Sequence, residues 1–278
     1  MPLTQANGIT IRYEIEGEQD AVPLLMVTGT GYPGAMYRTG PSALLAEKGF
    51  RVITYDHRGI GGSDKPDEPY STRLFAQDAS GLLQALGIER AHVLGHSMGG
   101  RVAQWMALDD PGRVRSLVLV ASGAGQSGAE FAVTKGLALN EAMKLIERGY
   151  EGHIRVQMYG RFYFTPAFVE RHPDVPEGLF RAFWDERPPL KCYLRHIIAR
   201  QQHQTAERLA EIGCPTLVIV SDGDTEVGST GSHFEQSEFL AQHIANTEWY
   251  VIPGAAHMFL WQLPEASTAA IADFLRRH

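Results

Sequence analysis

The sequence is poor in cysteine and contains no long hydrophobic run. Its two cysteines, Cys192 and Cys214, lack CxxC spacing and have no group of metal ligands nearby, so we expect reduced thiols rather than a disulfide, zinc or redox site. No segment approaches the roughly 18 uninterrupted apolar residues that span a bilayer, and the first residues lack the features of a signal peptide. The expected location is the cytoplasm.

Positive charge is also scarce. Lys and Arg number 25 against 32 Asp and Glu, which gives a formal net charge of -7. Nucleic acids and anionic membranes attract proteins through clustered Lys and Arg, so we expect neither as a partner. A length of 278 residues with 44% hydrophobic and 21% charged residues is typical of one large globular domain, with or without a modest insertion.

Short apolar runs alternate with amphipathic stretches along most of the chain. The runs are rich in Val, Ile and Leu, which suits strands buried on both faces of a parallel sheet; they cover 23–27, 52–55, 92–94, 117–120, 216–220 and 249–252, and an alternating pattern over 9–15 predicts a further, half-exposed or edge strand. Helical spacing occurs over 44–48, 72–86, 98–108, 234–244 and 264–276. This alternation predicts an α/β fold with a mostly parallel, doubly wound sheet.

One segment interrupts the alternation. From about Gly123 to Thr205 the sequence shows no core strand, and aromatic and aliphatic residues recur on stretches with helical spacing. We expect a helical insertion after the strand that ends near Val120.

A serine stands at the junction between one predicted strand and the next helix, in Gly95-His96-Ser97-Met98-Gly99. The motif G-x-S-x-G in this context is typical of a nucleophile elbow, a sharp turn that holds a serine in a strained backbone conformation. The flanking glycines permit close backbone approach, and the helix N-terminus favours a developing oxyanion. Because the motif arises by chance in about a tenth of chains this long, the interpretation depends on its context.

A serine hydroxyl needs a base to remove its proton and an acid to orient that base. In hydrolases with this elbow the chain order is Ser, Asp or Glu, then His. His257, in the loop between the last predicted strand and helix, is the expected base. Asp224 follows the strand 216–220 and is the preferred acid, with Asp222 and Glu226 as open alternatives.

An oxyanion hole is expected beside the elbow. Its donors would be the backbone N–H of Met98, directly after the nucleophile, and that of Thr30, in the glycine-rich loop after the strand 23–27. The loop lacks the Gly-Lys-Ser/Thr ending of a Walker motif and a G-x-G-x-x-G pattern, so it does not indicate a phosphate site.

Taken in order, these segments resemble the α/β-hydrolase superfamily across nearly the whole chain; they are Thr28–Gly31, Asp56–Ser63, Gly95–Gly100, Ser221–Asp224 and Gly254–His257. The resemblance implies a core of residues 1–122 and 206–278, a helical cap over 123–205, and a pocket between them. It also implies that Asp56 and Arg58 form a structural pair. Where many relatives have His-Gly before the oxyanion residue, this chain has Thr28-Gly29, so hydrogen bonding in that loop is expected to differ.

The expected activity is hydrolysis of a small, apolar carboxylic ester or lactone through an acyl-enzyme on Ser97, without a metal or organic cofactor. A serine at this position disfavours the haloalkane dehalogenases and epoxide hydrolases of the superfamily, which carry Asp there. Cleavage of a C–C bond in a diketone-type substrate, perhydrolase or cofactor-free oxygenase chemistry, and a non-enzymatic ligand receptor remain alternatives. The sequence carries no signal of the oligomeric state.

Overall fold

A computed structural model describes residues 2–125, 139–225 and 232–278. The strands are β1 (Leu3–Ala6), β2 (Ile9–Glu16), β3 (Val22–Val27), β4 (Phe50–Tyr55), β5 (Ala91–His96), β6 (Val114–Val120), β7 (Thr216–Ser221) and β8 (Thr247–Ile252). The helices are α1 (Pro41–Glu47), α2 (Thr72–Ala85), α3 (Met98–Asp109), α4 (Leu139–Met158), α5 (Pro166–Arg171), α6 (Asp174–Asp185), α7 (Leu190–Gln201), α8 (His233–His243), α9 (Phe259–Gln262) and α10 (Pro264–Arg276).

Within these ranges the strands form one sheet of eight, in the order β1-β2-β4-β3-β5-β6-β7-β8. The strands from β3 to β8 are parallel. At one edge β2 pairs antiparallel with β4, and β1 pairs antiparallel with β2. The predicted α/β fold is confirmed. The sequence pattern missed β1, which has only four residues and a single buried side chain, so β2 is the second strand rather than the edge.

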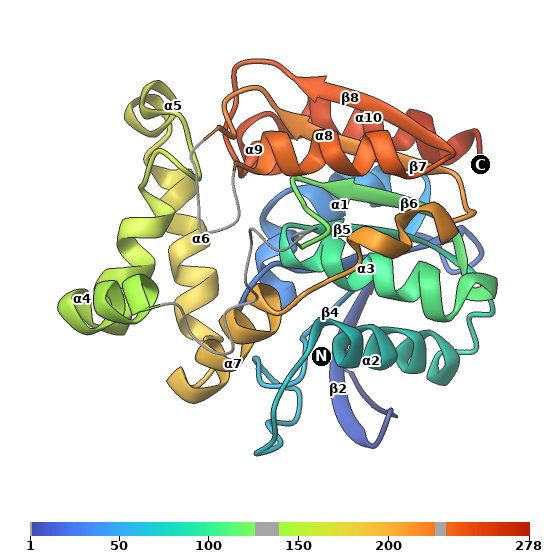
Figure 1. The fold of residues 1–278 in the computed structure, drawn as a ribbon, viewed down its shortest axis with the longest axis horizontal. Helices are drawn as coiled ribbons and strands as arrows, with labels where there is room; N and C mark the ends of the chain where they lie inside the picture. Colours follow the sequence, from blue (N-terminus) through green and yellow to red (C-terminus); the bar gives the residue numbers. More distant parts are fainter. Residues whose placement is uncertain (1, 126–138, 226–231) are drawn as a thin grey trace.

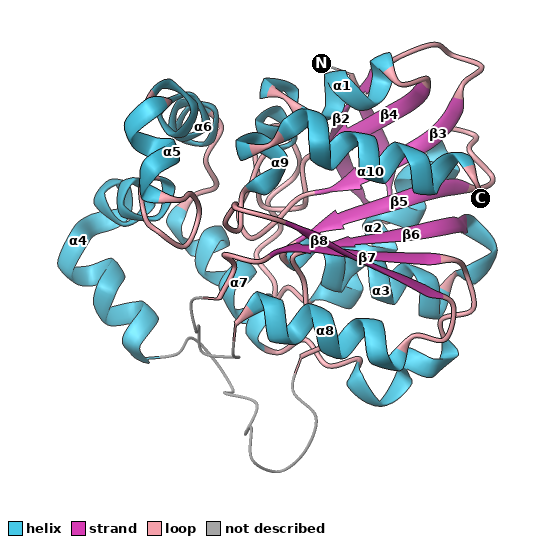
Figure 2. Ribbon diagram, turned by 90° about the horizontal axis from the view of Figure 1, so that it is seen from above, coloured by secondary structure: helices cyan, strands magenta, loops and turns pink. Residues whose placement is uncertain are grey.

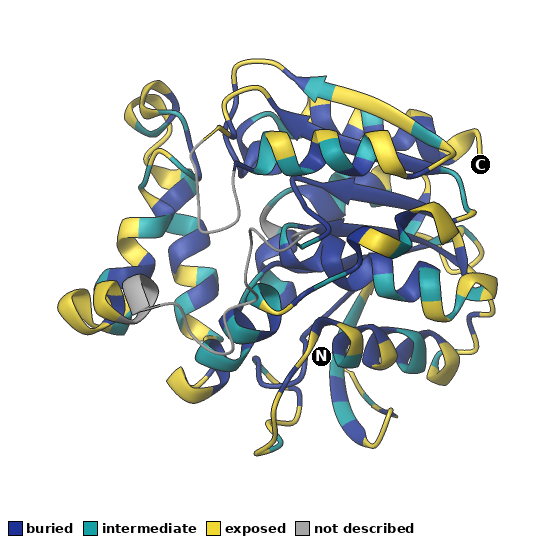
Figure 3. Ribbon diagram, in the orientation of Figure 1, coloured by how far each residue is buried: buried dark blue, intermediate teal, exposed yellow. Residues whose placement is uncertain are grey.

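Each face of the sheet packs against its own set of helices, because successive side chains of a strand point to opposite sides. In β3, Leu24 and Met26 belong to the core shared with α1 and α10, whereas Leu25 and Val27 belong to the core shared with α2, α3 and α8. Figure 3 shows the central strands as the buried centre of the molecule, and β5 and β7 are buried along their whole length. Burial on both faces explains their unbroken apolar runs.

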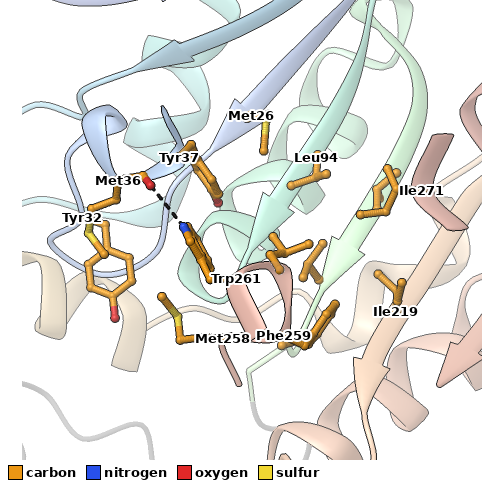
Figure 4. Packing of buried hydrophobic residues seen from close by; sticks show 14 of the residues in the cluster. Met26, Tyr32, Met36, Tyr37, Leu94, Ile219, Met258, Phe259, Trp261 and Ile271 are labelled. Atoms are coloured by element: carbon orange, nitrogen blue, oxygen red, sulfur yellow. Dashed lines mark hydrogen bonds between the residues drawn. The ribbon is translucent and has the colours of Figure 1, made fainter. Parts of the chain in front are cut away.

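The first core continues into the loops near the site (Figure 4). Trp261 of α9 stacks on Tyr37, with ring centroids 5.5 Å apart, and its indole N–H donates to the carbonyl of Met36 at 3.3 Å. Phe259 and Met258 lie beside it, fully buried. This packing fixes the end of the segment that carries His257.

The helices α4 to α7 lie between β6 and β7 in the sequence, and α4, α5 and α6 stand to one side of the sheet (Figures 1 and 2). They fall within the segment for which the sequence predicts a helical insertion; residues 126–138 of that segment lie outside the described ranges. Among the described helices, none is both long and apolar enough to cross a membrane.

Asp56 and Arg58 are both structural, but the expectation that they pair with each other is wrong. The Asp56 carboxylate accepts hydrogen bonds from the amides of Gly34 and Gly62, each at 2.9 Å, and pairs with Arg12. Arg58 turns the other way and forms two bonds of 2.6 Å with Asp78 of α2. A separation of two residues in an irregular loop does not determine which way each side chain points.

The Arg58–Asp78 pair is almost completely shielded from water, with side-chain exposures of 3% and 0%. Replacement of Asp78 by Ala would leave the buried Arg58 guanidinium with the half-exposed Glu68 as its remaining carboxylate partner, so we expect a loss of about 3 kcal/mol in the free energy of unfolding, the lower end for breaking a buried pair. Urea denaturation followed by circular dichroism measures it. The control is Asp109→Ala, which removes the partner of the half-exposed Arg73 and should cost less than about 1 kcal/mol. Equal losses would contradict the assignment.

Candidate active site

Ser97 occupies the strained turn that its motif predicts. Its φ of 57° and ψ of −120° lie in a region that non-glycine residues rarely adopt. Its amide donates to the carbonyl of Val120 at 2.8 Å, and its carbonyl accepts the hydroxyl of Ser122 at 2.8 Å. The surrounding structure therefore holds the strained conformation in place.

The glycines of the motif have a steric reason. A Cβ on Gly95 would lie 2.3 Å from the carbonyl oxygen of Gly99, and a Cβ on Gly99 would lie 2.0 Å from that of Val27. Helix α3 can begin this close to β3 and β5 only where both side chains are absent. The close approach places Ser97 at the carboxyl end of β5.

His257 and Asp224 form a hydrogen bond of 2.8 Å between Nδ1 of the imidazole and Oδ2 of the carboxylate. Both side chains are buried, at 3% and 0% exposure. Because Nδ1 donates to Asp224, the other nitrogen of the ring, Nε2, is the atom available to take up a proton. The structure thus brings the preferred base and acid together.

The rival acids are placed differently. The Asp222 carboxylate is exposed and accepts the amide of Gly254 at 2.8 Å, which closes the turn between β7 and the loop of His257. The alternative Glu226 lies outside the described residues. Of the described candidates, Asp224 is the one in contact with His257.

The expected oxyanion loop lies against Ser97. A Cβ on Gly29 would be 3.5 Å from Cβ of Ser97, and the hydroxyl of Thr28 donates to the carbonyl of Tyr32 at 2.8 Å, which closes the turn. Met98 is the first residue of α3, so its amide has no partner within the helix. The amide of Thr30 donates no hydrogen bond within the described residues. Both N–H groups are available to a ligand.

Two buried histidines of the recognised motifs support these loops. Burial, together with the neighbouring His257, lowers the pKa of His96 well below its usual value, and its Nε2 lies 3.2 Å from the carbonyl oxygen of His257. Burial and the neighbouring His196 lower the pKa of His57 to about 3, and its Nε2 lies 3.3 Å from the carbonyl oxygen of Thr28. Each neutral ring can donate to a loop carbonyl, so each helps to fix a loop of the site.

The segment between α4 and α5 contributes backbone hydrogen bonds to the loop of the base. The amides of His257 and Met258 donate to the carbonyls of Phe162 and Tyr163, at 3.1 and 2.9 Å. The ring of Phe162 stacks on that of His257 with centroids 4.6 Å apart. From the other side, a Cβ on Gly31 would lie 2.6 Å from the ring of Tyr193 in α7. The insertion therefore contacts both the base and the oxyanion loop.

His233, the first residue of α8, completes the site and was not among the residues that the sequence singles out. Its Nδ1 lies 3.7 Å from Oδ1 of Asp224, and its ring centroid lies 4.3 Å from that of His257. The capping box of Ser232 and Glu235 marks the start of this helix in the sequence, but not its position beside the acid. Among the described residues, Asp224, His233 and His257 form the cluster whose donor atoms could hold a metal ion.

Comparison with known proteins agrees with this geometry. Residues 22–264 match the family described as the alpha/beta hydrolase fold. The chain belongs to the α/β-hydrolase family. It is 30% identical to a protein of Azorhizobium caulinodans that bears the name carbamate hydrolase RutD, over 99% of this chain and 98% of that one.

Two enol-lactonases are among the other relatives of this α/β hydrolase. A 3-oxoadipate enol-lactonase of Acinetobacter baylyi is 27% identical over 99% of this chain and 96% of its own. The crystal structure of the enol-lactonase from Burkholderia xenovorans superimposes with a TM-score of 0.82 at 26% identity, covering 99% of this chain and all of that one. These relatives support a hydrolytic activity.

The choice of acid predicts a difference between two neighbouring carboxylates. In Asp224→Asn the amide cannot hold His257 in the tautomer that leaves Nε2 free, and kcat for p-nitrophenyl butyrate should fall by orders of magnitude, about 10⁴-fold in a serine protease triad. The matched control, Asp222→Asn, removes an exposed carboxylate from the same turn and should stay within a few-fold of wild type. If Asp222→Asn loses activity and Asp224→Asn keeps it, the acid is wrongly assigned.

Proposed function

We propose that this protein is a serine hydrolase that cleaves small carboxylic esters or lactones through an acyl-enzyme on Ser97. The observation that carries the proposal is the buried hydrogen bond between His257 and Asp224, in a site that also contains a serine in the strained elbow conformation. A base oriented by a carboxylate and a serine on a sharp turn are the parts that nucleophilic acyl transfer requires.

In the proposed reaction, Nε2 of His257 takes the proton of the Ser97 hydroxyl as its oxygen attacks the acyl carbonyl. Asp224 keeps the imidazole oriented and stabilises it while it is charged. The amides of Met98 and Thr30 donate to the oxyanion of the tetrahedral intermediate, aided by the positive end of the α3 dipole. The protonated His257 then delivers its proton to the leaving alcohol, and water hydrolyses the acyl-enzyme by the same steps.

The surroundings of the site favour an apolar substrate. Phe162 and Tyr163 stack on the ring of His257, and Tyr32 makes an edge contact with Tyr163 at a centroid distance of 6.4 Å. Burial and the neighbouring Tyr163 raise the pKa of Tyr32 well above its usual value, so this ring stays uncharged. Aromatic walls bind apolar acyl or alcohol groups through buried area. The enol-lactonases among the relatives support a lactone as a substrate class, separately from the apolar character of the site.

A fluorophosphonate probe and a pair of serine variants test the nucleophile. Wild type should be labelled covalently and should turn over p-nitrophenyl butyrate steadily, while Ser97→Ala should lose both labelling and turnover. Ser80→Ala, on helix α2, serves as the control and should behave as wild type. Turnover of a small lactone, followed by acid release at constant pH, then compares ring opening with ester cleavage.

The outcomes separate a serine hydrolase from a non-enzymatic ligand receptor on the same fold. A folded wild-type protein that is not labelled would overturn the proposal. Labelling without repeated turnover of any ester or lactone would indicate a ligand receptor that reacts once.

A further inference from the structure

The carboxylate of Asp224 has an oxygen that the proposed mechanism does not use. Its Oδ2 accepts the bond from His257, whereas its Oδ1 is buried and has no hydrogen-bond partner among the described residues. A buried carboxylate oxygen without a donor is costly, because the charge has lost water and gained nothing in return. This oxygen requires a donor.

The nearest imidazole supplies one. Nδ1 of His233 is likewise buried, has no hydrogen-bond partner within the described part of the chain, and lies 3.7 Å from Oδ1 of Asp224. The two unmatched atoms thus face each other at a distance slightly longer than a hydrogen bond. Catalytic hydrogen bonds are often long before substrate binds.

Contacts of the residues directly before and after His233 hold it in this place at the start of α8. The amide of Phe234 donates to the backbone carbonyl of Asp224 at 3.0 Å, which ties the first turn of the helix to the loop after β7. Ser232 caps the helix through its side chain, which accepts the amide of Glu235 at 3.2 Å. Phe162 covers the ring of His233 at a centroid distance of 5.4 Å. Both backbone and ring contacts direct the imidazole at the acid.

The charges around His233 favour its neutral form. Burial lowers its pKa well below the usual value, and the effect is reinforced by His257, by Arg101 of α3, by Arg200 of α7 and by His96. Asp224 is the acidic group in contact with it, so the ring is surrounded mainly by cations and other imidazoles. A neutral imidazole carries one N–H, which can be placed on Nδ1.

We propose that His233 is a positioning residue whose Nδ1–H donates to Oδ1 of Asp224 and fixes the carboxylate in the orientation that serves His257. The inference rests on the proposed function, because it assigns His233 to the acid of that same triad. Two imidazoles then flank one carboxylate, one on each oxygen. His233 does not touch the substrate's reacting atoms; it acts through Asp224.

Substitutions at this position separate a hydrogen-bonding role from a packing role. In His233→Leu the donor is lost, and kcat for p-nitrophenyl butyrate should fall on the order of tenfold or more with KM little changed, since a hydrogen bond to a charged group is removed. Asparagine carries its amide nitrogen at the same position along the side chain as Nδ1, so His233→Asn should retain most of kcat. His243→Asn, at the exposed end of the same helix, is the control and should match wild type.

The pH dependence gives a readout that packing alone would not move. In the proposed triad the acidic limb reports protonation of the base, and a carboxylate that has lost a donor stabilises the protonated imidazole more strongly. The acidic limb of the kcat profile should therefore move to higher pH in His233→Leu and stay near its wild-type position in His233→Asn. If His233→Leu does not fold, His233→Gln replaces it, because its amide reaches the position of Nε2 rather than Nδ1. Equal kcat values and acidic limbs in the Leu or Gln variant and in wild type would overturn the inference.

A measurement without substrate keeps this test independent of the proposed function. Nitrogen-15 NMR of histidine-labelled protein at neutral pH should show His233 as the neutral tautomer with its proton on Nδ1. In Asp224→Leu, which removes the acceptor, this tautomer should lose its preference. A charged His233, or a proton on Nε2 in wild type, would refute the positioning role even in an active enzyme. The expected tautomer in a protein that turns over no ester or lactone would instead overturn the proposed function alone.

Discussion

The close approach of helix α3 to strand β3, where Gly99 meets the carbonyl of Val27, is the constraint on which the rest of the site depends. It forces the chain to reverse within a single residue, and that residue is Ser97. The same contact directs the first amides of α3 toward the carboxyl edge of the sheet, where the parallel strands deliver the other loops. A side chain at position 99 would displace the helix, and with it the serine and one oxyanion donor.

The base, by contrast, depends on contacts from several directions. Its loop follows β8 and leads into α9, whose Trp261 is held by the core. Gln262 links this loop to the insertion, since its side chain accepts the amide of Ala256 at 3.2 Å and donates to the hydroxyl of Thr165 at 2.8 Å. His257 is therefore fixed by the sheet core, by α9 and by the segment after α4, and its orientation is a property of the whole assembly.

Most of the fold could be predicted from the sequence, because β3 to β7 are mostly buried and produce short apolar runs, and α10 begins at Pro264 and ends at Arg276 as its periodicity indicates. The expectation that the run 249–252 is buried on both faces is wrong, because β8 is the edge strand and Trp249 and Tyr250 are exposed. Chain order and motif spacing were sufficient to predict that Asp224 and His257 come together. The partners of Asp56 and Arg58 were not predictable, because they are Arg12 and Asp78, which lie in distant segments of the sequence.

His233 was missed for a related physical reason. A histidine at the start of a helix is not unusual by itself. Its contact with Asp224 depends on the position in space at which α8 begins, and no local sequence pattern specifies that position. Phe162 and Tyr163 contact the loop of His257 through hydrogen bonds of their backbone carbonyls. These bonds do not depend on the type of side chain, so the sequence does not predict them. Short-range patterns predict elements, whereas contacts between elements require the packed structure.

The backbone bonds from residues 162 and 163 to the loop of His257 also determine which parts of the insertion tolerate changes in sequence and which do not tolerate changes in length. They depend on main-chain atoms, so the exposed side chains of α5 and α6 can vary without disturbing the loop of His257, whereas a deletion or insertion between 160 and 165 would shift the register of those bonds. Exchange of α5 and α6 for the corresponding helices of a relative would therefore preserve the position of His257 when the junctions spare this short segment. The exposed faces of these helices and the geometry around His257 can in this sense change independently.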